Sequence, residues 1–383
     1  MASVEKVYTD FRIQGLMAAL QSYTLSQPMQ LSSLRCFFLN RIFDIQLDPL
    51  EIEPTDNGFE SFFTRYALLC RLAVNANREI ETFSHWQLTE VINYMKKSRE
   101  CREGFLKEIT TKEAFMWEGE LRERHVAETL LDLAAGLWSM LSIGRFPGDI
   151  SYDEPIFWED SRAFDIPGHP DALIEQQFST RYESEEFVKL PQSFTAAHLE
   201  QIGGIEVIWT SNLADHLLLK DDDTKLMLFH QVSILSLHKT SQTSPLPKDL
   251  VEETLRSISL LIPPILGERN PWFVQQRKKH NIDAHAGLCD RLNSSQRQID
   301  KFVYWRDRLV LLKRTFDDAE PRNLSQLWLD DRKKTQWFTF WVAVLVFILT
   351  VFFGVIQSVA GIVQAWASVQ SLKSQGSPQP AAG

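Results

Sequence analysis

The chain has 383 residues, of which 44% are hydrophobic and 23% charged, and its 40 basic and 50 acidic residues give a net charge of −10. These averages exclude a disordered chain, a collagen-like repeat and a multi-span membrane protein. The acidic balance also argues against nucleic acid as a partner, because nucleic-acid binders carry a basic face. The four cysteines form no CxxC pair, which is typical of small buried side chains in a reducing compartment.

Residues 1–144 are predicted to form an N-terminal helical region. Residues 1–12 carry charges and lack a continuous apolar core, which does not fit a cleaved signal peptide. Residues 48–58 contain two prolines and an Asn-Gly pair, which predicts a loop. Between residues 59 and 141, apolar side chains recur every three or four positions and predict several helices. The recurring residues are Phe62, Phe63, Tyr66, Leu69 and Leu72 in one segment and Val126, Leu130, Leu133 and Leu137 in another.

Residues 145–238 are predicted to form an irregular region with a small sheet. Prolines, glycines and aromatic residues crowd residues 145–191, which predicts an ordered but irregular connection. Residues 205–209 (IEVIW) and 225–229 (KLMLF) are predicted strands. A third strand at 217–219 would precede a polar turn at 221–224, so we expect a small antiparallel sheet. The polar segment 239–247 (KTSQTSPLP) is predicted to be a linker and a domain boundary.

Residues 249–336 are predicted to form a long-helix region. Asp249 is a candidate N-cap for a helix over 249–262, because Glu252 and Glu253 follow it. Residues 275–319 are expected to form one or two long helices. Pro321 would restart the helix, which then leads into the apolar segment that follows.

Residues 337–357 are predicted to form a transmembrane helix. The run FTFWVAVLVFILTVFFGVI at 338–356 matches the roughly 20 apolar residues needed to cross a bilayer, and aromatic residues crowd its entry. Residues 337–372 carry no charge, but two spans with a turn need more than this length. Residues 358–372 are therefore expected to continue as a weakly amphipathic helix, and residues 373–383 to form a disordered tail.

Basic residues on the two sides of this span predict its orientation. Arg332, Lys333 and Lys334 precede it, whereas Lys373 alone follows it. Because positive flanks stay on the cytosolic side, the N-terminal part is expected to be cytosolic. The lipid bilayer is thus the one partner that the sequence identifies.

One face of the predicted span carries small and hydroxyl residues: Thr350, Gly354, Ser358, Gly361 and Ala365. Such spacing lets helices approach closely in lipid, which favours a homo-oligomer. A chance arrangement of small residues and a water-lined pore face are the alternatives.

Motifs for chemistry are sparse in this chain. It contains no GxGxxG, GxxxxGK[ST], GxSxG or HExxH motif, so we assign neither catalytic residues nor a cofactor. The segment HNIDAH at 280–285 has ligand-type side chains, but its spacing does not place them on one helical face. Asp221, Asp222 and Asp223, together with His216, are weak candidates for a divalent-cation site, since hard cations favour carboxylates. An exposed turn is the alternative for the acidic triplet.

Several segments resemble a fungal family of membrane proteins described as CorA-like. The segments are 302–353, 154–160 (EPIFWED) and 198–223 (HLEQIGGIEVIWTSNLADHLLLKDDD). The resemblance implies a long helix that enters the membrane, as in CorA-type divalent-cation channels. Those channels carry a Gly-Met-Asn signature and a second span, where this chain reads Gly354-Val355-Ile356 and has one span. No functional residue is carried over from them.

The predicted fold is therefore mainly α: a helical cytosolic domain with a small antiparallel β element and a long helix leading into one C-terminal transmembrane helix. The leading functional hypothesis is a single-pass membrane protein with a cytosolic interaction domain and no catalytic activity. The alternative is a divergent CorA-like metal-ion channel subunit with Thr350, Gly354, Gln357 and Ser358 facing the pore. A third is a membrane-tethered enzyme of unrecognised type.

Overall fold

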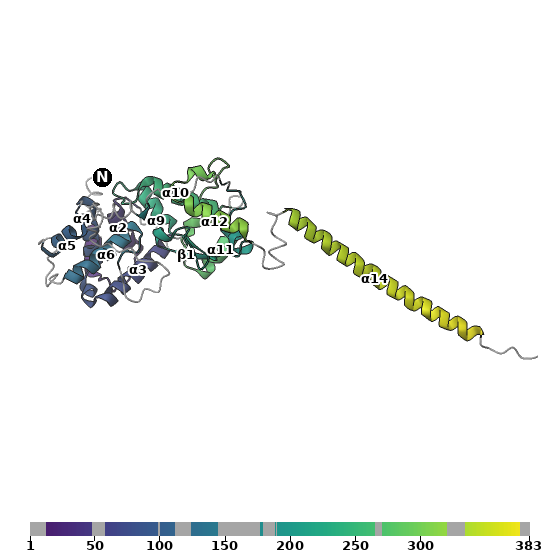
Figure 1. The fold of residues 1–383 in the computed structure, drawn as a ribbon. Helices are drawn as coiled ribbons and strands as arrows, with labels where there is room; N and C mark the ends of the chain where they lie inside the picture. Colours follow the sequence, from purple (N-terminus) through teal and green to yellow (C-terminus); the bar gives the residue numbers. More distant parts are fainter. Residues whose placement is uncertain are drawn as a thin grey trace, which may run out of the picture. The chain divides into compact units, whose positions relative to one another are not determined.

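The computed structural model describes residues 13–47, 58–98, 100–111, 124–144, 177–178, 188, 190–264, 270–319 and 334–375. It is mainly helical, with one small sheet and a long apolar helix near the C-terminus, which confirms the predicted fold class (Figure 1). Contacts divide the chain into two units, unit 1 (Met1–Ala319) and unit 2 (Glu320–Gly383).

The first part of unit 1 is a group of packed helices. After a helix over residues 13–22 come α2 (Ser32–Phe43), α3 (Phe59–Ala76), η2 (Arg78–Thr82), α4 (His85–Lys97), α5 (Arg102–Thr111) and α6 (Arg124–Ser139). Local sequence explains where they begin and which face they bury. A reciprocal capping box between Ser84 and Gln87 starts α4. The apolar repeat predicted in α6 is buried throughout, from Val126 to Leu137.

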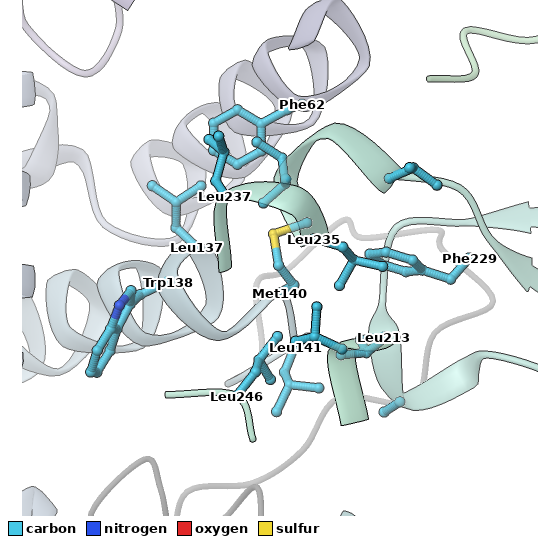
Figure 2. Packing of buried hydrophobic residues seen from close by; sticks show 14 of the residues in the cluster. Phe62, Leu137, Trp138, Met140, Leu141, Leu213, Phe229, Leu235, Leu237 and Leu246 are labelled. Atoms are coloured by element: carbon cyan, nitrogen blue, oxygen red, sulfur yellow. The ribbon is translucent and has the colours of Figure 1, made fainter. Parts of the chain in front are cut away.

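The end of α6 joins these helices to the sheet. Met140 has a left-handed φ of 58°, and its carbonyl accepts the N–H of Leu213 at 2.9 Å. Phe62 of α3 and Leu137 of α6 lie in the same apolar cluster as Phe229 of β3 (Figure 2). Residues from the predicted helical and irregular regions therefore share one hydrophobic core.

The sheet has three strands in the order β1 (Glu206–Thr210), β3 (Lys225–Phe229), β2 (Leu219–Lys220). The predicted turn at 221–224 is present and joins β2 to β3 as an antiparallel pair. The expectation of an all-antiparallel sheet is wrong, because β1 pairs with β3 in parallel, with Glu206 opposite Lys225. The chain reverses once between β1 and β2 and again at the turn, so β1 and β3 run in the same direction.

The predicted linker at 239–247 lies inside unit 1 and forms no domain boundary. It connects α9 (Val232–Thr240) to α10 (Lys248–Leu261). Leu246 is buried in the core, and the His238 ring lies 2.9 Å from the Ser244 hydroxyl. The polar composition of this segment is explained by these turn-forming hydrogen bonds. The boundary between units lies after Ala319 instead.

The prediction of one or two long helices over residues 275–319 is wrong. The segment contains α11 (Pro271–Lys279), two short 3-10 turns, η5 (Ala284–Gly287) and η6 (Ile299–Lys301), and then α12 (Arg306–Asp318). The side chain of Asp283 accepts the His285 N–H, and that of Asn293 accepts the Gln296 N–H. Such side-chain to backbone bonds compete with helix formation.

Unit 2 contains α14 (Lys334–Gln375), a single 42-residue helix. The predicted continuation over 358–372 is therefore helical. The expected restart at Pro321, the segment 154–160 and the tail beyond Gln375 lie outside the described residues.

Candidate functional site

The apolar part of α14 spans Phe338–Ser371, which is 34 residues long; its most apolar stretch has a mean hydropathy of 2.7, and none of that stretch is buried. Among the described residues it is the one helix long and apolar enough to cross a membrane. At about 1.5 Å per residue it extends over about 51 Å, whereas a hydrocarbon core is about 30 Å thick. The segment is thus longer than one crossing needs.

The predicted small-residue face runs along this helix. Thr350, Gly354, Ser358, Gly361 and Ala365 are all exposed. The Thr350 hydroxyl donates to the Val346 carbonyl at 2.8 Å, and the Ser358 hydroxyl donates to the Gly354 carbonyl at 2.9 Å. Their polar groups are satisfied within the helix, which lowers the cost of placing them in lipid. Nothing lies within 4 Å of a Cβ built on Gly354 or Gly361.

The basic residues used to predict orientation precede this helix. Arg332 and Lys333 lie outside the described residues, and Lys334 is the first residue of α14.

The acidic triplet and His216 do not converge. Asp221, Asp222 and Asp223 are exposed in the turn before β3, each with a left-handed φ between 52° and 61°. Asp221 forms an ion pair with Lys225 at 2.7 Å. Among the described residues, no group of three or more His, Cys, Asp or Glu side chains is placed to hold a metal ion.

His216 is instead a fully buried core residue. Its Nε2 lies 2.7 Å from the Ser257 hydroxyl, and its Nδ1 accepts the Phe229 N–H at 3.3 Å. The ring contacts Trp305 edge to face at 4.8 Å. Burial lowers the pKa of His216 well below its usual value, and the positive charge of Arg308 lowers it further. Both ring nitrogens are occupied by hydrogen bonds in the core.

A polar cluster that sequence reasoning missed lies where α9 begins. Ser233, Asp283 and His285 meet there; Asp283 and His285 belong to the HNIDAH segment, whereas Ser233 lies 50 residues away from Asp283. His280, the first residue of that segment, is exposed and does not belong to the cluster. No spacing rule connects Ser233 to Asp283, because the contact is tertiary.

The residue types of this cluster match a hydrolase triad, but its geometry does not. In a triad the serine and the carboxylate bond to opposite ring nitrogens. In this cluster the Ser233 hydroxyl, at 2.7 Å, and the Asp283 carboxylate, at 3.5 Å, both face Nδ1 of His285. The Asp283 carboxylate also accepts the Ser233 N–H at 2.6 Å, the Ser233 hydroxyl at 2.9 Å and the His285 N–H at 2.8 Å. This bonding is typical of a buried carboxylate that fixes a backbone turn.

Gly58 holds the start of α3 against the same cluster. A Cβ added to Gly58 would lie 1.7 Å from the Ser233 hydroxyl oxygen and 2.3 Å from an Asp283 carboxylate oxygen. Only a residue without a side chain allows this approach. The cluster therefore joins the N-terminal helices to the second half of unit 1.

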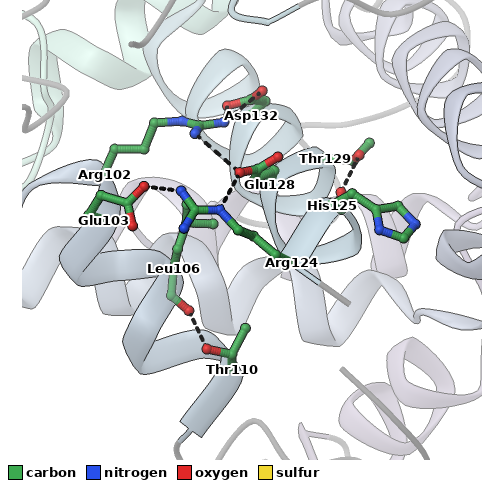
Figure 3. A network of polar contacts seen from close by, with 9 residues as sticks. All are labelled: Arg102, Glu103, Leu106, Thr110, Arg124, His125, Glu128, Thr129 and Asp132. Atoms are coloured by element: carbon green, nitrogen blue, oxygen red, sulfur yellow. Dashed lines mark hydrogen bonds and ion pairs between the residues drawn. The ribbon is translucent and has the colours of Figure 1, made fainter. Parts of the chain in front are cut away.

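A second charged cluster joins α5 to α6 (Figure 3). Arg102 contacts Asp132 at 3.3 Å, and Arg124 pairs with both Glu103 and Glu128. Burial raises the pKa of Asp132 to about 6, while the charge of Arg102 opposes the rise. The dense charges of this region thus form ion pairs between two helices.

None of the four cysteines forms a disulfide bond. Burial raises the pKa of Cys70 and of Cys289 to about 12. Both side chains therefore remain thiols at neutral pH.

Comparisons with known proteins add no relative: no family model, no curated protein and no solved structure matches this chain. The resemblance to CorA-like proteins stays a prediction, as do the hypotheses of an ion channel and of a tethered enzyme.

Proposed function

We propose that this chain is a single-pass membrane protein, in which α14 anchors unit 1 at a membrane surface. The observation that carries the proposal is the apolar segment Phe338–Ser371, which bears no charge and whose most apolar stretch is not buried. A helix that is apolar on all sides needs either a protein core or lipid around it. Since its most apolar stretch is not buried in protein, lipid is the environment that its composition fits.

The proposed crossing is the first half of this segment, residues 338–356. These 19 residues match the thickness of a hydrocarbon core, whereas Gln357, Gln364 and Gln370 add amide groups to the second half. The second half would then extend beyond the bilayer core. Arg332, Lys333 and Lys334 on the N-terminal side favour a cytosolic unit 1.

Unit 1 is the proposed interaction domain of the protein. Its helices and sheet share one core, and it offers no described metal cluster or triad geometry on which to base a reaction. Tethering such a unit through one helix confines its contacts to partners at the same membrane.

Alkaline carbonate extraction tests the anchor. Membranes that contain the full chain are washed at high pH, which releases peripheral proteins and retains spanning ones. The full chain is expected in the pellet with an integral marker protein. Recovery of the chain in the supernatant with a peripheral marker would overturn the proposal.

We also propose that the small-residue face of α14 mediates self-association. Small side chains permit the close backbone contact that stabilises helix pairs in lipid. Replacing both Gly354 and Gly361 with Leu is expected to lower the dimer fraction measured by cross-linking in membranes. The matched control replaces Val355 and Ile362 with Leu, one position further along the helix in each case. Equal dimer fractions in the two double variants would contradict this assembly.

A further inference from the structure

The apolar segment of α14 is longer than one crossing of a bilayer can hold. Transmembrane helices tilt by about 20° on average, and a core about 30 Å thick then holds about 21 residues at about 1.5 Å each. A crossing that begins at Phe338 therefore ends near Ser358. At the steep tilt of about 40° it would hold about 26 residues and end near Val363. Trp366 and Val369 lie beyond either limit, although both are apolar.

The side chains of the second half, residues 357–371, are divided between two faces. At about 100° per residue, five large apolar side chains fall within an arc of about 120°. This apolar face consists of Val359, Ile362, Val363, Trp366 and Val369. The opposite arc of about 60° forms a polar face with four members. They are Gln357, Gln364, Ser368 and Ser371, while Gln370 lies near one edge of the apolar face.

The first half of the segment has no such division. Between Phe338 and Ile356 the hydroxyl residues are Thr339 and Thr350, and neither Gln nor Ser occurs. A helix that is apolar on all sides suits the interior of a bilayer, whereas a helix with one apolar and one polar face suits a boundary between lipid and water.

The apolar face is exposed along its whole length. Each of its five side chains exposes more than half of its surface. A helix that continued straight out of the bilayer would hold this face in water, at a cost in free energy that grows with the apolar area.

Two features at the start of the second half favour a bend. The Ser358 hydroxyl donates to the Gly354 carbonyl at 2.9 Å, and hydroxyl bonds of this kind often bend helices. Gly361 follows within one turn, and glycine weakens a helix because it gains conformational freedom when the helix opens. A bend here would change the direction of the helix where the crossing ends.

The membrane surface is the apolar environment nearest to this face. The residues after Ser358 begin at the headgroup region, because the hydrocarbon core ends there. Amphipathic helices lie at this depth with their apolar face against acyl chains, and tryptophan is enriched there. Residues 338–371 carry no charge, so contact through apolar area is the interaction that their composition offers.

We propose that residues 358–371 of α14 lie along the membrane surface where the crossing ends, with the apolar face against lipid acyl chains and Gln364 and Ser368 toward water. This placement rests on the proposed crossing at 338–356. It is compatible with self-association, because the small-residue face is centred about 120° away from the apolar face around the helix.

Photo-cross-linking of the full chain in phosphatidylcholine nanodiscs tests this placement. The probe p-benzoylphenylalanine replaces one residue at a time, at Ile362 or Trp366 on the apolar face and at Gln364 or Ser368 on the polar face. Lipid adducts are counted by mass spectrometry, and the yield on the apolar face is expected to be at least about threefold higher than on the polar face. A probe at Phe347, within the proposed crossing, is expected to form lipid adducts as well.

The pattern of adducts separates this placement from its alternatives. Equally high yields at all four positions of the second half would place it inside the hydrocarbon core, and background yields at all four would place it in water; either result would overturn the proposal. Cross-linked dimers without lipid adducts at Ile362 and Trp366 would assign the apolar face to a second copy and would also overturn it. In each of these cases adducts at Phe347 leave the crossing itself supported. Background yield at Phe347 would overturn the crossing and this placement together.

A double variant tests the apolar face through its chemistry. Ile362→Ser combined with Trp366→Ser is expected to lower the lipid-adduct yield of a probe at Val369 at least about threefold, since most of the apolar area is lost. The matched control, Gln357→Ser combined with Gln364→Ser, alters the polar face and is expected to change that yield less than about twofold. Equal yields at Val369 in the two double variants would overturn the placement.

Discussion

Burial controls the protonation of several histidines in unit 1. It lowers the pKa of His85 and of His230 to about 4 and that of His238 to about 3. Each ring has a hydrogen bond that suits the neutral form, such as that between His238 and Ser244. In the unfolded chain these rings titrate near an ordinary pKa of about 6.5.

Acid is therefore expected to destabilise the folded protein. Because the folded pKa values lie below the unfolded value, the unfolded chain takes up protons that the folded chain does not. The free energy of unfolding should fall as the pH drops below about 6.5, by about 2 kcal/mol per buried histidine at pH 5. Asp132 acts in the opposite direction, since its pKa is raised to about 6.

Urea unfolding of the detergent-solubilised chain at pH 7 and pH 5 measures this dependence. His238→Gln should reduce the difference between the two pH values by about 2 kcal/mol. His280, which is exposed, provides the matched control as His280→Gln. A pH dependence that is the same in wild type and His238→Gln would show that burial of this ring is not its source.

Gly58 is the second residue at which a single change should be costly. Its Cβ position is occupied by the Ser233 and Asp283 side chains, which hydrogen bonds hold in place. Gly58→Ala is expected to lower the free energy of unfolding by about 1–3 kcal/mol or more through overpacking. Gly15→Ala, where nothing lies within 4 Å, should leave it equal or slightly higher. The idea fails if the two alanine variants have the same urea midpoint.

At the scale of elements, α14 offers a test of which half crosses the bilayer. Replacing Phe347 and Val351 with Arg would place two charges near the middle of the proposed crossing. Each charge is expected to raise the free energy of membrane insertion by about 3 kcal/mol. Replacing Gln364 and Ser368 with Arg introduces two charges at the same spacing in the second half of the helix. Insertion into microsomes, scored by glycosylation of a C-terminal acceptor tag, should fall sharply only for the first pair. A larger fall for the second pair would place the crossing in the second half.

Elements with a strong local signal were predictable from the sequence. The uncharged run at 337–372 predicted the helix now seen as α14, and the apolar repeat of α6 predicted its buried face. The hairpin of β2 and β3 followed from the polar turn at 221–224. In each case residues close together in the sequence determine the secondary structure.

Elements that depend on distant partners were not predictable. The parallel pairing of β1 with β3 depends on the path of residues 211–224 across the sheet. The turns between α11 and α12 depend on side-chain bonds of Asp283 and Asn293, which periodicity does not register. The cluster of Ser233, Asp283 and His285 brings together residues about 50 positions apart, and no motif links them.

At the scale of the whole molecule, the described residues of the hydrophobic core all belong to unit 1. Its buried residues run from Leu20 to Phe316, and the most apolar stretch of α14 contributes none of them. A chain cut after Ala319 is therefore expected to be soluble without detergent and to unfold in one cooperative urea transition. Aggregation of this chain, or loss of its cooperative transition, would show that unit 1 needs unit 2 to fold.

We propose that α14 crosses a membrane once and leaves unit 1 in the cytosol. Protease protection in sealed microsomes tests it directly, with different tags on the two termini of one full-length chain. We predict that external protease removes the N-terminal tag and leaves the C-terminal tag intact until detergent is added. Digestion of the C-terminal tag in sealed microsomes, with a lumenal marker still protected, would contradict this topology.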